Sequence, residues 1–111
     1  MTERLFVTEY VKKNQAISSD EAEKIYNVLR DILKKKERVV LDFNGISLLI
    51  SSFLNSAIGK LYGEFKQDFI ERFVAYENMD DQDEYILQRV IGRAKDYYGN
   101  KDLIKGIVND A

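Results

Sequence analysis

The sequence predicts an α/β fold in which helices pack against a sheet that contains parallel strands. Apolar runs of strand length alternate with longer stretches whose apolar residues recur every three or four positions. Turn-forming residues separate these segments, and no repeat, low-complexity tract or linker interrupts them. Because 111 residues make about one ordinary domain, we expect a single domain over residues 1–111.

The first strand is expected at Leu5 to Val11, which read Leu-Phe-Val-Thr-Glu-Tyr-Val, because β-branched and aromatic residues favour strands. A helix should follow. Ser18 and Glu21 have the spacing of a capping box, in which each side chain satisfies a free backbone N–H group. Apolar residues at helical spacing extend this helix to about Lys35: Ala22, Ile25, Leu29, Ile32 and Leu33.

A second strand is expected at Val39 to Phe43, a short apolar run ended by the turn-prone pair Asn44-Gly45. This pair is also typical of a β-hairpin. A loop into a helix is favoured, with Ser51 or Ser52 as the N-cap, because the next apolar residues follow helical spacing. These residues are Phe53, Leu54, Ala57, Ile58, Leu61, Tyr62 and Phe65.

A third strand is expected at Phe69 to Tyr76, followed by a helix whose first turn is acidic. The acidic residues are Asp80, Asp81, Asp83 and Glu84, and one helix face carries Ile86, Val90, Ala94 and Tyr97. The tail from Leu103 to Val108 is apolar enough to dock as a strand or as a final helical turn. The order of strands and helices predicts parallel neighbours joined by right-handed crossovers.

The charge of the chain bears on its partners and its location. A net charge of −2 leaves no basic footprint for a phosphate backbone, so nucleic acid is not expected as a partner. The N-terminus does not resemble a signal peptide, and no stretch approaches eighteen apolar residues. We therefore expect a protein of the cytoplasm that does not enter a membrane.

The residue types that are absent exclude most catalytic chemistry. The chain has no Cys and no His, which removes thiol nucleophiles, thiolate zinc sites, imidazole bases and a His-activated serine. The glycines fall in no phosphate-binding motif, and the acidic group lacks the spacing of a calcium-binding loop. We expect neither an enzyme nor a bound metal or other cofactor.

The most informative segment is Val39 to Asn55, VVLDFNGISLLISSFLN. It resembles the centre of the STAS superfamily, where an apolar strand ending in "V-L-D-hydrophobic-x-G-V" precedes a helix-capping serine. It is more closely similar to the STAS-like family DUF4325, in which "S-x-x-E-A" comes before "V-V-L-D-F-x-G-V" and "serine-Phe-x-acid". The matching positions are Ser18 to Ala22, Val39 to Ile46 and Ser52 to Asn55, within a resemblance over about residues 17–97.

The resemblance implies a STAS-like domain with a mixed sheet of four or five strands and a role in protein–protein regulation. Partners in such families are often ATPases of the histidine-kinase type. In the anti-sigma factor antagonists a serine at this helix start is phosphorylated, and Ser52, with Ser51 beside it, is the matching position. Ile50 and Phe53 stand where the antagonists have Asp and Gly, so helix capping alone is the alternative reading of Ser52.

These observations predict a regulatory domain that binds a partner protein at the second helix start and the loop before it. The predicted contact residues are Asp42, Asn44, Ser47, Ser51, Ser52, Phe53 and Asn55. A structural or homo-oligomeric subunit is one alternative, because seven Tyr and six Phe are many for this length. The other is a small enzyme that gathers carboxylate, Lys and Tyr groups around Asp42 in a pocket.

Overall fold

The computed structural model describes the backbone of residues 2–110 and the side chains of residues 2–99. Three parallel strands, β1 (Thr2–Phe6), β3 (Arg38–Asp42) and β5 (Val74–Glu77), form the main sheet in the order β1-β3-β5. The short strands β2 (Gln15–Ala16) and β4 (Leu48–Leu49) pair in parallel as a second sheet. The α/β class is confirmed, but the strands form two parallel sheets rather than one mixed sheet.

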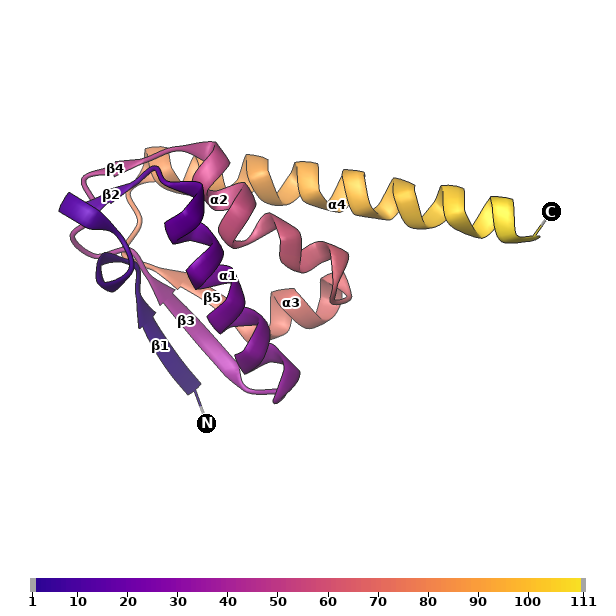
Figure 1. Ribbon diagram of the computed structural model, residues 1–111, viewed down its shortest axis with the longest axis horizontal. Coiled ribbons are helices and arrows are strands. Elements are labelled where there is room, and N and C mark those ends of the chain that lie inside the picture. Colours follow the sequence, from indigo (N-terminus) through magenta and orange to yellow (C-terminus); the bar gives the residue numbers. More distant parts are fainter. Residues whose placement is uncertain (1, 111) are drawn as a thin grey trace.

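Over residues 2–110, four α-helices connect and cover these strands: α1 (Ser19–Lys34), α2 (Ser51–Ala57), α3 (Gln67–Phe73) and α4 (Asp81–Asp110). Short 3-10 helices occur at η1 (Val7–Glu9), η2 (Lys12–Asn14) and η3 (Gly59–Gly63). Figure 1 shows α4 crossing the molecule beside α2 and then extending well beyond the other elements. Within the part of the chain that the structure describes, no helix is long and apolar enough to cross a membrane.

The start of α1 confirms the predicted capping box only in part. Ser18 is the N-cap, and its hydroxyl accepts a hydrogen bond from the backbone N–H of Glu21 at 3.4 Å. The apolar stripe of the helix is buried against α2 and the main sheet, as the helical spacing predicted, at Ala22, Ile25, Leu29 and Leu33. This packing, more than the cap, fixes α1 in place.

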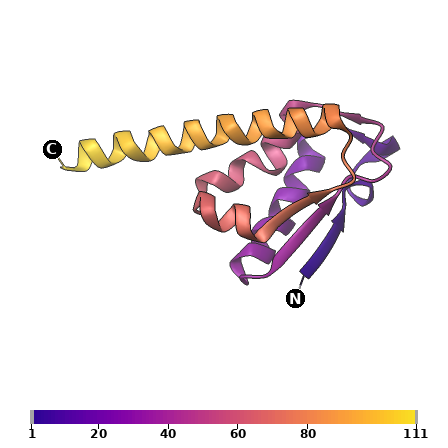
Figure 2. The same ribbon diagram turned by 180° about the vertical axis from the view of Figure 1, so that it is seen from behind.

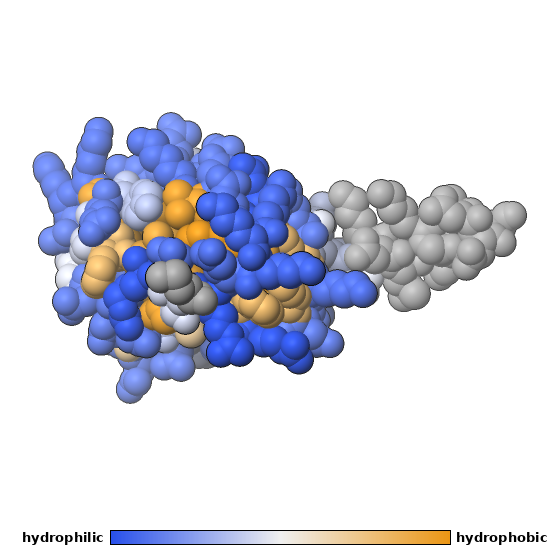
Figure 3. All heavy atoms as spheres, turned by 90° about the horizontal axis from the view of Figure 1, so that it is seen from below, coloured by the Kyte–Doolittle hydropathy of each residue, from blue (hydrophilic) through white to orange (hydrophobic). Residues whose placement is uncertain are grey.

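The helices that connect the three strands of the main sheet lie on one face of that sheet. Both crossovers step in the same direction across the sheet, and right-handed crossovers of this kind place their helices on the same side. Val39 and Leu41 are each 1% exposed on the covered face, whereas Ala75 is exposed on the other face. Seen from behind, no helix lies in front of the three strands (Figure 2). Seen from below, the surface is mostly hydrophilic, and apolar side chains (orange) are visible between the hydrophilic ones (Figure 3).

The first predicted strand is wrong beyond Phe6. The strand begins earlier, at Thr2, and the chain turns into η1, where the Tyr10 N–H donates to the Val7 carbonyl at 2.9 Å. Val7 is completely buried, so the apolar residues of this segment fill the core from a turn rather than from a strand. Composition alone did not distinguish these two states, because both bury the same side chains.

The second predicted helix stops earlier than its apolar spacing indicated. α2 ends at Ala57, and η3 continues the chain with Ile58, Leu61 and Tyr62 still buried. Gly63 in η3 leaves room for the ring of Tyr98 from α4, since a Cβ there would lie 2.5 Å from that ring. The spacing therefore identified the core residues correctly and the continuity of the helix wrongly.

The predicted strand from Phe69 to Tyr76 is mostly helical. Residues up to Phe73 belong to α3, and only Val74–Glu77 form β5. Phe65, Phe69 and Phe73 recur at four-residue spacing, and their rings stack with centroid separations of 5.7 and 4.4 Å. That spacing is a helical signal which aromatic content, read as strand propensity, obscured.

The start of α4 agrees with the sequence. The Asp80 carboxylate accepts a hydrogen bond from the Asp83 N–H at 2.7 Å, as an N-cap does. The buried face consists of Leu87, Val90, Ile91 and Ala94, whereas Ile86 is half-buried and Tyr97 is 60% exposed, so the predicted apolar face is correct only at Val90 and Ala94. The backbone of the predicted tail, Leu103 to Val108, continues α4, so the strand alternative is wrong; its side chains lie outside the described residues.

Replacing Gly63 with Ala should displace the Tyr98 ring and weaken the contact between η3 and α4. We expect a loss of about 1 kcal/mol in the free energy of unfolding, measured by urea denaturation. Gly92→Ala is the matched control, because nothing but its chain neighbours and the backbone of its own helix lies within 4 Å of its Cβ position in α4. That control should gain up to about 1 kcal/mol from helix propensity, and an equal gain in Gly63→Ala would contradict the close approach.

Candidate functional site

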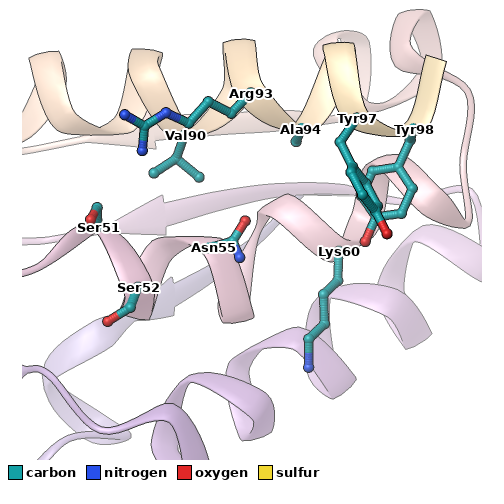
Figure 4. Close-up of a pocket in the computed structure, with 9 residues that line it drawn as sticks. All are labelled: Ser51, Ser52, Asn55, Lys60, Val90, Arg93, Ala94, Tyr97 and Tyr98. Carbon is teal, nitrogen blue, oxygen red and sulfur yellow. The ribbon is translucent and has the colours of Figure 1, made fainter. Parts of the chain in front are cut away.

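A groove of about 570 Å³ lies between α2 with η3 on one side and α4 on the other. Figure 4 shows its nine lining residues, which are Ser51, Ser52, Asn55, Lys60, Val90, Arg93, Ala94, Tyr97 and Tyr98. Two tyrosines close one end, with ring centroids 4.8 Å apart in an edge-to-face arrangement. The groove thus joins the predicted contact residues Ser51, Ser52 and Asn55 of α2 to a wall from α4 that the predicted contact set did not contain.

Neither Ser51 nor Ser52 is the N-cap of α2, so this prediction is wrong. Ile50 takes that position with extended φ and ψ of −118° and 156°, and no side chain caps the helix. The two serines are instead the first helical residues, and both side chains are exposed. Their hydroxyls are accessible at the surface, which capping would have restricted.

The other predicted contact residues divide into exposed and buried groups. Asn44, Ser47 and Asn55 are exposed, and the Ser47 hydroxyl donates to the Asn14 carbonyl at 3.2 Å. The side chain of Phe53 is only 1% exposed and forms part of the core. Phe53 therefore supports α2 from below rather than offering a surface to a partner.

Asp42 is buried at the carboxyl end of β3 and holds a hydrogen-bond network. One carboxylate oxygen accepts from the Asn44 N–H and from the Asn78 side-chain amide, both at 2.9 Å. The other accepts from Arg4 at 2.7 Å, and Arg4 also pairs with Glu77 at 3.0 Å. Hydrogen bonds from Asn78 and Asn44, with help from Arg4, lower the pKa of Asp42 below its ordinary value.

This network leaves Asp42 with little capacity to bind anything else. Its side chain is 5% exposed and both oxygens already have partners. Asp42 does not line the groove between α2 and α4. Its hydrogen bond from the Asn44 N–H instead stabilises the turn that follows β3.

An exposed apolar patch lies next to the start of α2. Leu48 is 47% exposed, Ile50 37% and Ile17 43%, and all three belong to or adjoin the β2–β4 ladder. The Ile50 N–H donates to the Ala16 carbonyl at 3.3 Å, which holds the two segments side by side. We call Ile17, Leu48 and Ile50 the ladder patch.

Sequence reasoning missed the ladder patch. A usable signal was present in Leu48-Leu49-Ile50, because alternate residues of a strand face opposite sides. Leu49 is 5% exposed, and its two neighbours face solvent. Large apolar side chains gathered on a surface are typical of interaction sites.

A smaller cavity of about 170 Å³ lies between β5, α3 and α4. Burial raises the pKa of Tyr62 to about 12 and that of Tyr76 higher still, so both hydroxyls are protonated at neutral pH. Lys95 is ion-paired with Glu71 at its edge. Asp42 does not line this cavity, which therefore differs from the pocket that the enzyme alternative requires.

The acidic residues at the start of α4 act within the helix. Asp80 caps the helix, and burial together with the charge of Asp80 raises the pKa of Asp83. Among residues 2–99, no three acidic side chains gather in a way that could hold a metal ion.

The chain matches a known protein family. The family described as "STAS-like domain of unknown function (DUF4325)" matches residues 21–84, which is more than half of the chain. The match contains the start of α2, most of the ladder patch and the whole Asp42 network except Arg4. No curated protein and no solved structure matches the chain.

Removing the charge of Asp42 should destabilise the fold. In Asp42→Asn the ion pair with Arg4 is lost and an amide N–H₂ faces existing donors, so we expect a loss of about 2 kcal/mol in the free energy of unfolding. Asp31→Asn is the control, because the Arg30–Asp31 pair is exposed with a separation of 3.5 Å. Equal small effects in the two variants would contradict the role of the network.

The Asp42 carboxylate should make the free energy of unfolding depend on pH in the acid range. Because its pKa is lower in the folded than in the unfolded state, Asp42 contributes stability above the unfolded value of about 3.9. That contribution is lost as the pH falls below this value through the folded pKa. Urea titrations at pH 7 and pH 3 should show a smaller acid-induced loss in Asp42→Asn than in the unsubstituted protein.

Proposed function

This chain belongs to the STAS-like family DUF4325, and on that premise we propose that it is a non-enzymatic regulatory domain of the cytoplasm that binds a partner protein. The contact surface consists of the ladder patch, the exposed start of α2 and the loop residues Asn44 and Ser47. The observation that carries the proposal is the adjacency of three exposed apolar side chains to two exposed serines. Apolar contacts supply affinity, and a neighbouring modifiable hydroxyl supplies control.

Phosphorylation of Ser52 or Ser51 is the proposed control. A kinase transfers the γ-phosphoryl group of ATP to the serine oxygen, with release of ADP and the hydroxyl proton. The product carries nearly two negative charges beside Ile50 and Leu48. Charge placed at an apolar contact disfavours binding because it must be desolvated, so the unmodified form binds the partner.

The partner that fits this proposal is an ATPase of the histidine-kinase type, the class that serves related STAS-like proteins. Such a partner also supplies the phosphoryl donor. The first experiment is capture of the tagged protein from its native host, with mass spectrometry of the bound proteins and of the peptide that contains Ser51 and Ser52. An ATPase together with a phosphorylated peptide supports the proposal.

Substitution in the ladder patch tests the surface itself. Leu48→Asp should lower the affinity for a captured partner at least tenfold, in calorimetry, with little change in stability, because Leu48 is 47% exposed. Asn27→Asp adds the same charge at an exposed position of α1 and should leave the affinity unchanged. Unaltered affinity in a folded Leu48→Asp variant would exclude this surface.

A second candidate function, as a homo-oligomeric structural subunit, is favoured by the uncovered face of the main sheet. Parallel sheets are usually covered on both faces, and here Ala75 and the edge strand β1 face solvent. A dimer joined at this face should dissociate in Ala75→Arg. Sedimentation of a monomer at micromolar concentration in the unsubstituted protein would eliminate this candidate.

A further inference from the structure

The groove between α2 and α4 is cationic. Its charged lining residues are Lys60 and Arg93, and no carboxylate lines it, although the whole chain has 19 acidic and 17 basic residues. The ammonium of Lys60 lies over the ring of Tyr26, 5.7 Å from its centroid. A site with this charge attracts an anion.

Arg93 is the cation that remains available in the groove. Its side chain is exposed and makes no ion pair or hydrogen bond with any residue whose side chain the structure describes. An anion in the groove can therefore pair with Arg93 without displacing any side chain of residues 2–99. Arg93 also lies outside residues 21–84, so the family match does not include it.

The two serines differ in how they face Arg93. In Figure 4 the guanidinium of Arg93 extends along α4 toward the start of α2, where Ser51 lies on the side facing α4. The side chain of Ser52 points away from α4. Ser51, unlike the side chain of Ser52, thus lies on the side of the α2 start where the guanidinium of Arg93 is found.

We propose that Arg93 is the receptor for a phosphate on Ser51, so that phosphorylation of this serine ties α2 to α4 across the groove. The inference rests on the proposed phosphorylation and specifies its position and its effect. A phosphate presents three acceptor oxygens, and a guanidinium binds two of them in parallel. The ion pair neutralises the groove and covers its end next to Ile50.

Phosphorus NMR tests this assignment without a partner. Two proteins are prepared with phosphoserine incorporated during translation, one at position 51 and one at position 52. The second pKa of a free phosphoserine is about 6, and a paired guanidinium should lower it by about half a unit at position 51 only. In the Arg93→Gln background the two positions should titrate alike, and Arg93→Lys should restore part of the difference.

Thermal unfolding of phosphate mimics provides an independent measurement. Ser51→Glu should raise Tm by about 2 °C over the corresponding Ser51→Gln variant, and this gain should vanish with Arg93→Gln. Ser52→Glu against Ser52→Gln is the matched control and should show no dependence on Arg93. Unphosphorylated Arg93→Gln should melt like the unsubstituted protein, because Arg93 has no partner to lose among the described side chains.

Equal phosphate pKa values at the two positions, or a lowered value at position 51 that survives Arg93→Gln, would overturn the assignment. Such a result leaves partner binding by the ladder patch intact, because Leu48→Asp tests that surface separately. Conversely, a Leu48→Asp result that contradicts partner binding by the ladder patch does not change the titration expected for phosphoserine at position 51.

Discussion

The hydrogen-bond network around the buried carboxylate of Asp42 is the interaction on which the rest of the structure depends. The carboxylate accepts hydrogen bonds from Arg4 of β1, from Asn44 in the following loop and from Asn78 after β5. The three strands of the main sheet are thereby joined near the carboxyl ends of β3 and β5, where Phe43 also donates to the Glu77 carbonyl at 3.0 Å. A sheet with one uncovered face has less buried apolar surface to hold its strands together, so polar ties at its end matter more.

The loop that leaves this network positions the candidate site. Gly45 follows Asn44 with φ of 85°, a left-handed conformation that favours glycine, and a Cβ there would lie 3.3 Å from the methyl group of Thr8. The chain then reaches β4, whose pairing with β2 leaves Leu48 and Ile50 on the outer side. The turn at Gly45 and the pairing of β2 with β4 therefore together determine where the exposed serines lie, although these elements belong to distant parts of the sequence.

The groove depends on a different contact, the packing of α4 against η3. Gly63 lets the Tyr98 ring approach the backbone of η3, and Val90 and Ala94 pack toward α2 on the same helix face. α4 therefore lies close enough to α2 for a side chain of one helix to reach the other, yet a groove remains between them. The ladder patch and the groove share the start of α2, so a charge placed there affects both surfaces.

The sequence by itself determined the α/β class, the family, the capped start of α1 and the buried stripe of that helix. These properties follow from local spacing and composition, which act over a few residues. The helical state of Gln67–Phe73 could also have been predicted from the sequence, because phenylalanines recur there every four residues. The candidate serines were identified from the motif, although their role as caps was not correct.

Only the tertiary structure decided which side chains are exposed and which surfaces meet. Phe53 and Leu48 are both apolar residues near the start of α2, yet one is 1% and the other 47% exposed. Their burial depends on β2 and α1, which lie earlier in the chain and which local patterns cannot place against α2. Arg93 faces Ser51 for the same reason: the approach of α4 to α2 is fixed by packing across the whole fold, not by any spacing within either helix.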